Sequence, residues 1–259
     1  MRIDQLLVQR GLAGTRSQAQ RLIADGVRWR SGETWQRVIK NGDHVAPDAE
    51  IELLDDAEAR YVSRGGLKLA GALAHRSMSV VGAVCLDLGQ STGGFTDCLL
   101  QAGASHVVGV DVGYGQLDAR LRDDPRVSCI ERVNARNLTM EALDPALSAA
   151  KVDGIFAGFD LIVGDLAFIS QTLVLPAVVP LLRPGGAMLM LVKPQFELQP
   201  GQVGKGGIVT DTGLHQVVEQ RIRQAHSALG LSVADYFLSS IQGGDGNQEF
   251  FIHSKRAQE

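Results

Sequence analysis

The spacing of apolar residues changes once within the first 55 positions. Apolar residues between positions 6 and 23 recur at helical spacing, with Gly11 placed to end a first short helix and Thr15 or Ser17 placed to cap a second. Beyond Gly26 the chain turns to short extended segments: VRW, RVIK and AEIELL, separated by turns at Ser31-Gly32 and Asn41-Gly42. The pattern predicts two helices followed by a small sheet.

From Tyr61 onward, apolar strands alternate with helical stretches. The strands we expect are 84–88, 106–111, 127–130, 160–164, 187–193, 233–239 and 249–253. The helices we expect are one after the Gly-Gly pair of YVSRGGLKLAGALAHRS, and then 94–102, 170–182 and 212–229. This alternation predicts an α/β fold with a doubly wound, mostly parallel sheet. The segment SIQGGDGNQ has no room for a helix, so the last strand should be antiparallel.

The change of pattern near position 60 predicts two domains. We expect a small α+β domain at 1–59, a linker at 60–66 and a larger α/β domain at 67–259. The 259 residues are 45% hydrophobic, which is enough for a sizeable core.

Composition narrows the class of protein. No apolar run approaches the roughly 18 residues that span a bilayer, and the N-terminus lacks a signal-peptide pattern, so we expect a soluble cytoplasmic protein. The six histidines show no metal-ligand spacing, so no metal site is predicted. The three cysteines lie in apolar patterns without a CxxC pair and should be reduced core thiols: Cys85, Cys98 and Cys129.

Charge is unevenly distributed along the chain. The net charge is −4, yet residues 1–40 carry eight basic against three acidic side chains, and residues 41–60 carry seven acids against Arg60. A basic first lobe on an acidic protein favours contact with nucleic acid. A solvated helix face that happens to be basic is the alternative.

The strongest local motif is CLDLGQSTGGF, a strand followed by a glycine-bearing turn and a helix. Such turns let a ligand approach backbone N–H groups at the carboxyl ends of the strands. The next strand ends at Asp111, an acid placed to accept hydrogen bonds from ribose hydroxyls in NAD and S-adenosylmethionine sites alike. The glycine spacing is not GxGxxG, and with the antiparallel last strand this favours a methyltransferase sheet. The cofactor residues predicted are Asp87, Gly89, Ser91, Gly93, Gly94, Phe95, Asp111, Asn134 and Asp165. For Asn134 we weigh an adenine contact against a simple turn.

The stretch AMLMLVKPQFE has a lysine at the end of an apolar strand. Lysine is seldom fully buried, so Lys193 is either a surface residue whose ammonium group extends into solvent or a residue with a chemical role. Pro194 cannot continue the hydrogen-bonded strand and explains why the chain leaves the sheet there.

The N-terminal stretch RIDQLLVQRGLAGTRSQAQRLIADG resembles the small RNA-binding domain of the ribosomal small-subunit protein S-four and of pseudouridine synthases. The resemblance covers residues 1 to about 56 and implies that a set of polar residues faces RNA: Arg2, Arg16, Gln20 and Arg21, to which we add Arg64. After Gly26 the sequence VRWRSG departs from the usual valine-asparagine-glycine turn.

The chain closely resembles the TlyA family of FtsJ-like ribosomal RNA 2'-O-ribose methyltransferases, once labelled haemolysins. The N-terminal RNA-binding pattern and five further stretches carry this resemblance: SRGGLKL, LGQSTGGFTD, LIVGDLAFIS, LVKPQFE and GGDGNQEFF. The resemblance implies S-adenosylmethionine as cofactor and a catalytic set of Lys68, Asp165, Lys193 and Glu249. The family usually has Ala where this chain has Gln90.

Methyl transfer to a ribose hydroxyl needs alignment of the two reactants and removal of a proton from a poor nucleophile. A lysine with its ordinary pKa of about 10.4 is protonated at neutral pH; burial beside a second lysine would lower that pKa, and a nearby carboxylate would raise it. We expect the four residues to converge as a coupled network. Lys193 would take or steer the 2'-hydroxyl proton, the two carboxylates would orient the lysines, and Lys68 would hold the ribose or its phosphate.

Three functions follow from these patterns. The first is 2'-O-methylation of ribosomal RNA at a cytidine, with the large subunit favoured and the small subunit as the alternative. The second is a membrane-active haemolysin, which would need an apolar span or a strongly amphipathic basic helix that the sequence lacks. The third is a non-catalytic RNA-binding protein on a methyltransferase scaffold, disfavoured by the complete catalytic set. The expected partner is ribosomal RNA or a ribosomal subunit, not DNA or a membrane, and the expected state is a monomer or weak dimer.

Overall fold

The N-terminal unit is a pair of helices packed on a small antiparallel sheet. In the computed structural model, which describes residues 1–54, 60–149, 157–243 and 246–258, this unit contains α1 (Ile3–Gln9), α2 (Arg16–Gly26), β1 (Val27–Arg30), β2 (Trp35–Arg37) and β3 (Glu50–Leu53). The strand order is β2-β1-β3, and both pairings are antiparallel. A buried cluster that includes Leu6, Leu22 and Val27 forms the core of this unit.

Local chemistry places the helix ends where the sequence predicts them. Gly11 follows α1 with a φ of 71°, a conformation that glycine adopts without strain. The Thr15 side chain accepts a hydrogen bond from the Gln18 N–H at the start of α2. The second strand differs from expectation, because pairing with β1 selects Trp35–Arg37 and not the RVIK segment.

The larger unit is a seven-stranded sheet in the order β6-β5-β4-β7-β8-β10-β9. Its strands are β4 (Val84–Leu88), β5 (His106–Asp111), β6 (Val127–Glu131), β7 (Phe159–Gly164), β8 (Leu182–Val192), β9 (Leu231–Leu238) and β10 (Phe250–Arg256). The first five are parallel, and β10 runs antiparallel to both of its neighbours. The predicted fold class and the antiparallel last strand are therefore confirmed.

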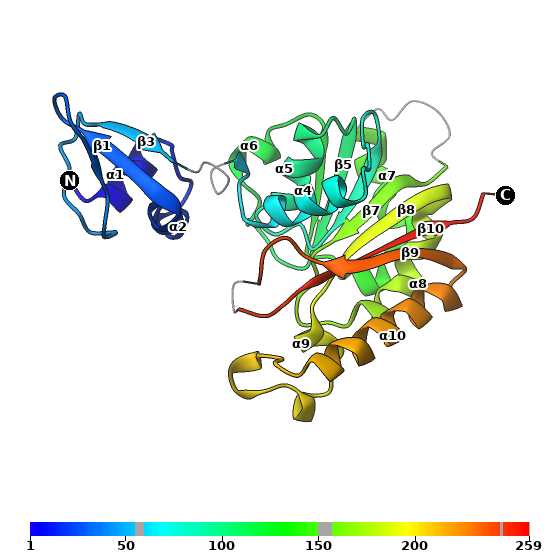
Figure 1. The fold of residues 1–259 in the computed structure, drawn as a ribbon. Helices are drawn as coiled ribbons and strands as arrows, with labels where there is room; N and C mark the ends of the chain where they lie inside the picture. Colours follow the sequence, from blue (N-terminus) through cyan, green and yellow to red (C-terminus); the bar gives the residue numbers. More distant parts are fainter. Residues whose placement is uncertain (55–59, 150–156, 244–245, 259) are drawn as a thin grey trace.

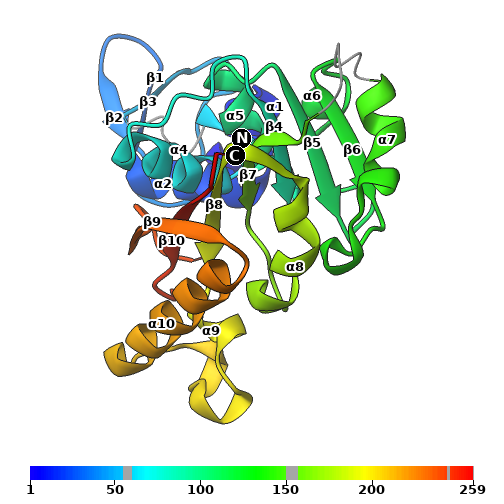
Figure 2. The ribbon, with the colours of Figure 1, turned by 90° about the vertical axis from the view of Figure 1, so that its right-hand side faces the viewer.

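Helices cover both faces of this sheet (Figures 1 and 2). They are α4 (Gly65–His75), α5 (Gly94–Gln101), α6 (Ala119–Arg122), α7 (Met140–Ala149), α8 (Leu175–Val178), α9 (Pro194–Glu197) and α10 (Thr212–Ala228), with short 3₁₀ turns at Ala135–Asn137, Gln171–Leu173, Val179–Leu181, Pro200–Gln202 and Lys205–Gly207. The predicted helix at 170–182 is wrong in form: Pro176 and Pro180 divide it into short turns. Helices α6, α7 and α9 were not predicted from the sequence.

Strand residues alternate between two cores because successive side chains point to opposite faces. Leu86 and Leu88 of β4 pack with α7, α8 and α10, whereas Cys85 packs with α4 and α5 on the other face. Both Cys85 and Cys98 are buried free thiols, and Cys129 is half-buried. The pKa of Cys98 is raised to about 12 by burial, which keeps this thiol protonated and unreactive.

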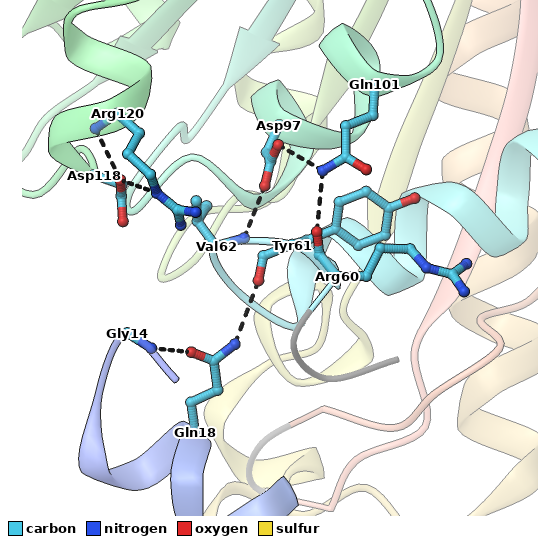
Figure 3. Close-up of polar contacts among 9 residues, drawn as sticks. All are labelled: Gly14, Gln18, Arg60, Tyr61, Val62, Asp97, Gln101, Asp118 and Arg120. Atoms are coloured by element: carbon cyan, nitrogen blue, oxygen red, sulfur yellow. Dashed lines mark hydrogen bonds and ion pairs between the residues drawn. The ribbon is translucent and has the colours of Figure 1, made fainter. Parts of the chain in front are cut away.

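Polar contacts tie the segment that follows the N-terminal unit to both units (Figure 3). The Gln18 amide donates to the Tyr61 carbonyl at 3.4 Å, and the Val62 N–H donates to Asp97 of α5 at 2.9 Å. The Gln101 amide donates to the Arg60 carbonyl at 3.0 Å. The domain limits 1–59, 60–66 and 67–259 stay a prediction, and the first limit falls at residues 55–59, outside the described ranges.

Candidate functional site

The glycine turn after β4 brings two strand ends into close contact. Gly89 has a φ of 78°, and a Cβ on this residue would lie 2.7 Å from the Asp165 carbonyl oxygen at the end of β7. The Asp165 N–H donates to the Leu88 carbonyl at 3.0 Å. Gly89 is therefore required by backbone geometry, and Asp165 is held beside the turn.

A cavity of about 660 Å³ lies beside this turn, within the range of roughly 300–1,000 Å³ that is usual for small-ligand sites. Gly89, Ser91, Asp111, Asn134 and Asp165, all predicted from the sequence, line it. The Asp111 carboxylate accepts hydrogen bonds from the Ser91 N–H at 2.7 Å and from the Gly113 N–H at 2.6 Å. The Asn134 side-chain oxygen accepts from the Arg136 N–H at 3.0 Å, so this residue makes its local turn and also lies at the cavity wall.

The other predicted cofactor residues do not line this cavity. Phe95 is buried in the core and stacks on Phe251, with ring centroids 6.3 Å apart. A Cβ on Gly93 would overlap Leu121, and one on Gly94 would overlap the Ser63 hydroxyl oxygen, so these two glycines allow close internal packing. This part of the motif therefore packs against the protein interior, on the side of the loop away from the cavity.

Gln90 departs from the family pattern, and the structure accommodates its side chain inside the protein. Its amide donates to Thr96 Oγ1 at 2.9 Å, and the Thr96 hydroxyl donates to Asp87 Oδ2 at 2.7 Å. A Cβ on Gly109 would lie only 1.9 Å from the Gln90 side chain, so the glycine at position 109 provides the space. The Gln90 side chain, at a position where the family usually has Ala, therefore does not enter the cavity wall.

Asp87 is fully buried beneath the loop. Burial raises the pKa of its carboxyl to about 7, the Thr96 hydrogen bond opposes this rise, and the nearby carboxylates of Asp165 and Asp111 add to it. The carboxyl groups of Asp111 and, where it is ionised, Asp87 contribute negative charge near the turn, whereas that of Asp165 is paired with the Lys193 ammonium.

Lys193 meets Asp165 at the cavity wall. Lys193 lies one residue beyond the end of β8, and its Nζ is 2.5 Å from Asp165 Oδ1. Both residues line the cavity. The predicted strand 187–193 is therefore one residue too long at its end, and the lysine is presented from the loop start.

Lys68 and Glu249 form a second pair. Lys68 of α4 is 8% exposed, and its Nζ is 2.5 Å from Glu249 Oε2. Phe250 is the register partner of Val192 in the β8–β10 ladder, so Glu249 and Lys193 come next to each other across the same two strands. Two lysine–carboxylate pairs therefore meet at the carboxyl end of β8, which the sequence order alone does not reveal.

Phe168 is a site residue that the sequence analysis missed. It is 90% exposed, has a φ of 62°, lines the cavity and lies with its ring centroid 5.2 Å from that of Phe196. A positive φ is uncommon in a bulky residue, so the backbone at this position is strained. The sequence feature that could have indicated Phe168 is its position as an aromatic residue three places after Asp165, the acid at the end of the strand.

The predicted RNA-facing residues lie on the N-terminal unit and at the start of α4. Arg2 and Arg16 both form ion pairs with the buried Asp4, at 2.9 and 3.0 Å, while their own side chains stay partly exposed. These two arginines hold the pKa of the Asp4 carboxyl well below its usual range. Gln20 is exposed, and Arg64 directly precedes the first turn of α4.

Comparison with protein families agrees with this geometry. Residues 61–256 match the model of the FtsJ-like methyltransferases, and residues 1–26 match the S4 domain. The chain is 42% identical to the 16S/23S rRNA (cytidine-2'-O)-methyltransferase TlyA of Mycobacterium tuberculosis, over 97% of this chain and 88% of that protein. This chain belongs to the TlyA family.

Solved structures show the same architecture for this TlyA-family chain. A candidate hemolysin from Streptococcus thermophilus is 39% identical, with a TM-score of 0.72 over 99% of this chain and 88% of that one. An S-adenosylmethionine-dependent methyltransferase from Listeria monocytogenes, 14% identical, shares the fold of the larger unit with a TM-score of 0.50 over 73% of this chain and 100% of that one.

Two further observations concern the other function classes. Across the described ranges, none of the helices combines the length and apolarity needed to cross a bilayer. The described residues also hold no group of three or more histidine, cysteine or acidic side chains placed to bind a metal ion.

Proposed function

We propose that this protein transfers a methyl group from S-adenosylmethionine to the 2'-hydroxyl of a ribose in ribosomal RNA, at a cytidine. Membership of the TlyA family supports the reaction class. The observation that carries the proposal is the pair Lys193–Asp165 in the wall of the cavity, with Lys68–Glu249 beside it. The large ribosomal subunit is the favoured target and the small subunit the second.

The residues around the cavity fit the cofactor. S-adenosylmethionine carries a positive sulfonium centre, a cationic amino group and a ribose, and it supplies an activated methyl group when bound. Asp111 has lone pairs left for the ribose hydroxyls after accepting two backbone hydrogen bonds. The Asp111 carboxylate, with that of Asp87 in its ionised form, favours the two cationic groups. Asn134 lies at the cavity wall, and we expect it to contact the adenine edge.

The protein then has to align the ribose hydroxyl and accept its proton. Lys193 takes or steers this proton, because its Nζ lies at the cavity wall and is oriented by Asp165. Glu249 holds the buried Lys68 from behind. Lys68 is 8% exposed and does not line the cavity, so in this proposal it pairs with Glu249 next to Lys193, and contact with the ribose or its phosphate stays a prediction.

The N-terminal unit supplies RNA binding in this proposal. Arg2, Arg16, Gln20 and Arg21 would contact phosphates and Arg64 would continue this surface towards α4; such contacts position RNA without reading its sequence. The target nucleotide must be extruded for its ribose to reach the cavity. We expect a cytoplasmic enzyme that acts as a monomer or weak dimer on a ribosomal subunit or its RNA.

A direct assay tests the proposal. Purified protein is incubated with labelled S-adenosylmethionine and with ribosomal subunits that lack the modification, and the labelled nucleotide is then mapped. We expect label on a ribose 2'-oxygen of a cytidine. Cofactor binding without transfer to any RNA would favour the non-catalytic scaffold.

A further inference from the structure

A buried carboxylate lies four residues beyond Lys193. Glu197 closes the short helix α9, is only 4% exposed and does not line the cavity. A buried carboxylate is costly unless its oxygens are hydrogen-bonded, so a side chain of this kind needs partners.

The partners of Glu197 come from the segment that follows Asp165. The Ser170 hydroxyl donates to Glu197 Oε2, and the Gln171 N–H donates to Glu197 Oε1 at 2.8 Å. The segment beyond β7 carries Asp165, and the segment beyond β8 carries Lys193. One carboxylate therefore joins the two segments that provide the Lys193–Asp165 pair.

The network continues into two further elements of the fold. The Gln171 side-chain oxygen lies 3.4 Å from Nε2 of the buried His226 of α10, and His226 Nδ1 lies 2.9 Å from Ser254 Oγ of β10. Burial lowers the pKa of His226 to about 4, so this imidazole is neutral at pH 7 and needs no counter-charge. Arg221 of α10 donates to the Glu197 backbone carbonyl at 2.5 Å. The Glu197 carboxylate is thus linked through Gln171 and His226 to β10, and the Glu197 backbone is bonded to α10.

Both segments also carry an aromatic ring of the site. Phe168 and Phe196 contact each other, and the Lys193 Nζ lies 6.0 Å from the Phe196 ring centroid. The β7–β8 ladder has its last register pair at Gly164 and Met190. Beyond it, backbone bonds hold Asp165 to β4 and Val192 to β10, while the Glu197 side chain joins the two segments to each other. A misplacement of about 1 Å at a reacting group can cost on the order of 100-fold in rate.

We propose that Glu197 is a positioning residue for methyl transfer, which holds the Asp165–Gln171 segment against the Lys193–Glu197 segment and thereby sets the geometry of the Lys193–Asp165 pair. The inference rests on the proposed function. Glu197 does not touch the reacting atoms; it acts through the two segments that it joins.

Steady-state kinetics with three variants test this role. Glu197→Ala removes both hydrogen bonds, and we expect kcat to fall about 10-fold or more, with little change in KM for the RNA or in the affinity for S-adenosylmethionine. Glu197→Gln keeps an oxygen for the Gln171 N–H and an amide for the Ser170 oxygen, so we expect kcat within about threefold of wild type. Asp235→Ala is the matched control: it removes contacts to His75 and Arg76 at the opposite side of the sheet, and should lower Tm without changing kcat.

Each outcome decides one question. Unchanged kcat in Glu197→Ala, or a loss in Glu197→Gln as large as in Glu197→Ala, overturns the positioning role. If Glu197→Ala does not fold, Ser170→Ala removes one of the two bonds and should lower kcat at least threefold; unchanged kcat in that variant overturns the role as well. Wild-type protein that methylates no ribosomal RNA in the same assay refutes the proposed function itself, whereas active wild type with an equally active Glu197→Ala refutes only the role of Glu197.

Discussion

Individual side chains at the end of β8 differ in what they can do chemically. Lys193 is the lysine placed at the cavity wall, while Lys68 is buried behind it. Replacing Lys193 with alanine should lower kcat at least about 100-fold, within the range expected for loss of a proton-transfer group, with binding of S-adenosylmethionine kept. Methyl transfer and cofactor affinity are measured in parallel, and Lys205→Ala, on an exposed loop, is the control. Turnover near wild type in Lys193→Ala would remove Lys193 from the mechanism.

Phe168 offers an exposed aromatic face in the cavity that Lys193 and Asp165 also line. A base stacked on an aromatic side chain gains about 1–3 kcal/mol, so Phe168→Ala should lower kcat/KM for the RNA by roughly 5-fold to 150-fold. Phe168→Trp keeps a ring and should retain most of this activity. Equal kcat/KM values in Phe168→Ala and wild type would exclude a stacking role.

We expect the Asp87 carboxyl to make the affinity for S-adenosylmethionine depend on pH. Its pKa is raised from 3.8 to about 7 in the folded protein, so the protonated group contributes fully to stability below pH 3.8, and this contribution is lost as the pH rises towards 7. The ionised form favours a cationic ligand, so affinity for S-adenosylmethionine should increase up to about tenfold from pH 6 to pH 8, one pKa unit on each side of 7. Isothermal titration calorimetry measures this, and Asp87→Asn should bind more weakly with a flat profile. The same slope in both proteins would assign the pH dependence to another group.

At the scale of elements, glycines decide how closely helices α4 and α5 approach. A Cβ on Gly94 would lie 2.2 Å from Ser63 Oγ and 2.9 Å from the Gly66 backbone nitrogen, just before the turn of α4 that carries Lys68. Gly94→Ala should therefore lower the free energy of unfolding by about 1–3 kcal/mol, as overpacking does. Urea unfolding measures this, and Gly201→Ala, with open space around the new methyl group, is the control. A stability loss of the same size in both variants would contradict the packing argument.

Elements also show where sequence patterns succeed. The strands 84–88 and 106–111 and the helix 212–228 match the prediction to within a residue, because their apolar periodicity is long and bounded by glycine or a cap. Helix α7 was not predicted, and it contains Pro145, a residue that usually interrupts a helix. The segment 170–182 was overpredicted for the opposite reason: its apolar spacing suits a helix, but its prolines remove the hydrogen bonds that would continue one.

At the scale of the whole molecule, RNA affinity should respond to salt through the N-terminal unit. Each phosphate contact contributes about 0.7–0.9 to the slope of log affinity against log salt concentration. Arg16→Ala with Arg21→Ala should thus reduce this slope by about 1–2 and weaken binding similarly for all RNA sequences. Binding titrations at several salt concentrations measure the slope, and Arg126→Ala, an exposed arginine paired with Asp124 on the larger unit, is the control. If the salt slope were unchanged in the double variant but reduced in the control, the RNA-binding surface would have to lie on the larger unit.

The sequence by itself determined the α/β architecture, the antiparallel last strand and the glycine turn, because these depend on local periodicity and on motifs read within short segments. The four catalytic candidates came from the resemblance of the sequence to the TlyA family. Tertiary structure decided which lysine pairs with which carboxylate, that Asp87, Gly94 and Phe95 lie behind the turn, and that Glu197 joins two loops. It also placed Phe168 in the wall of the same cavity as Lys193 and Asp165. These features depend on contacts between segments distant in the chain, whose distances and burial are set only when the sheet orders its strands.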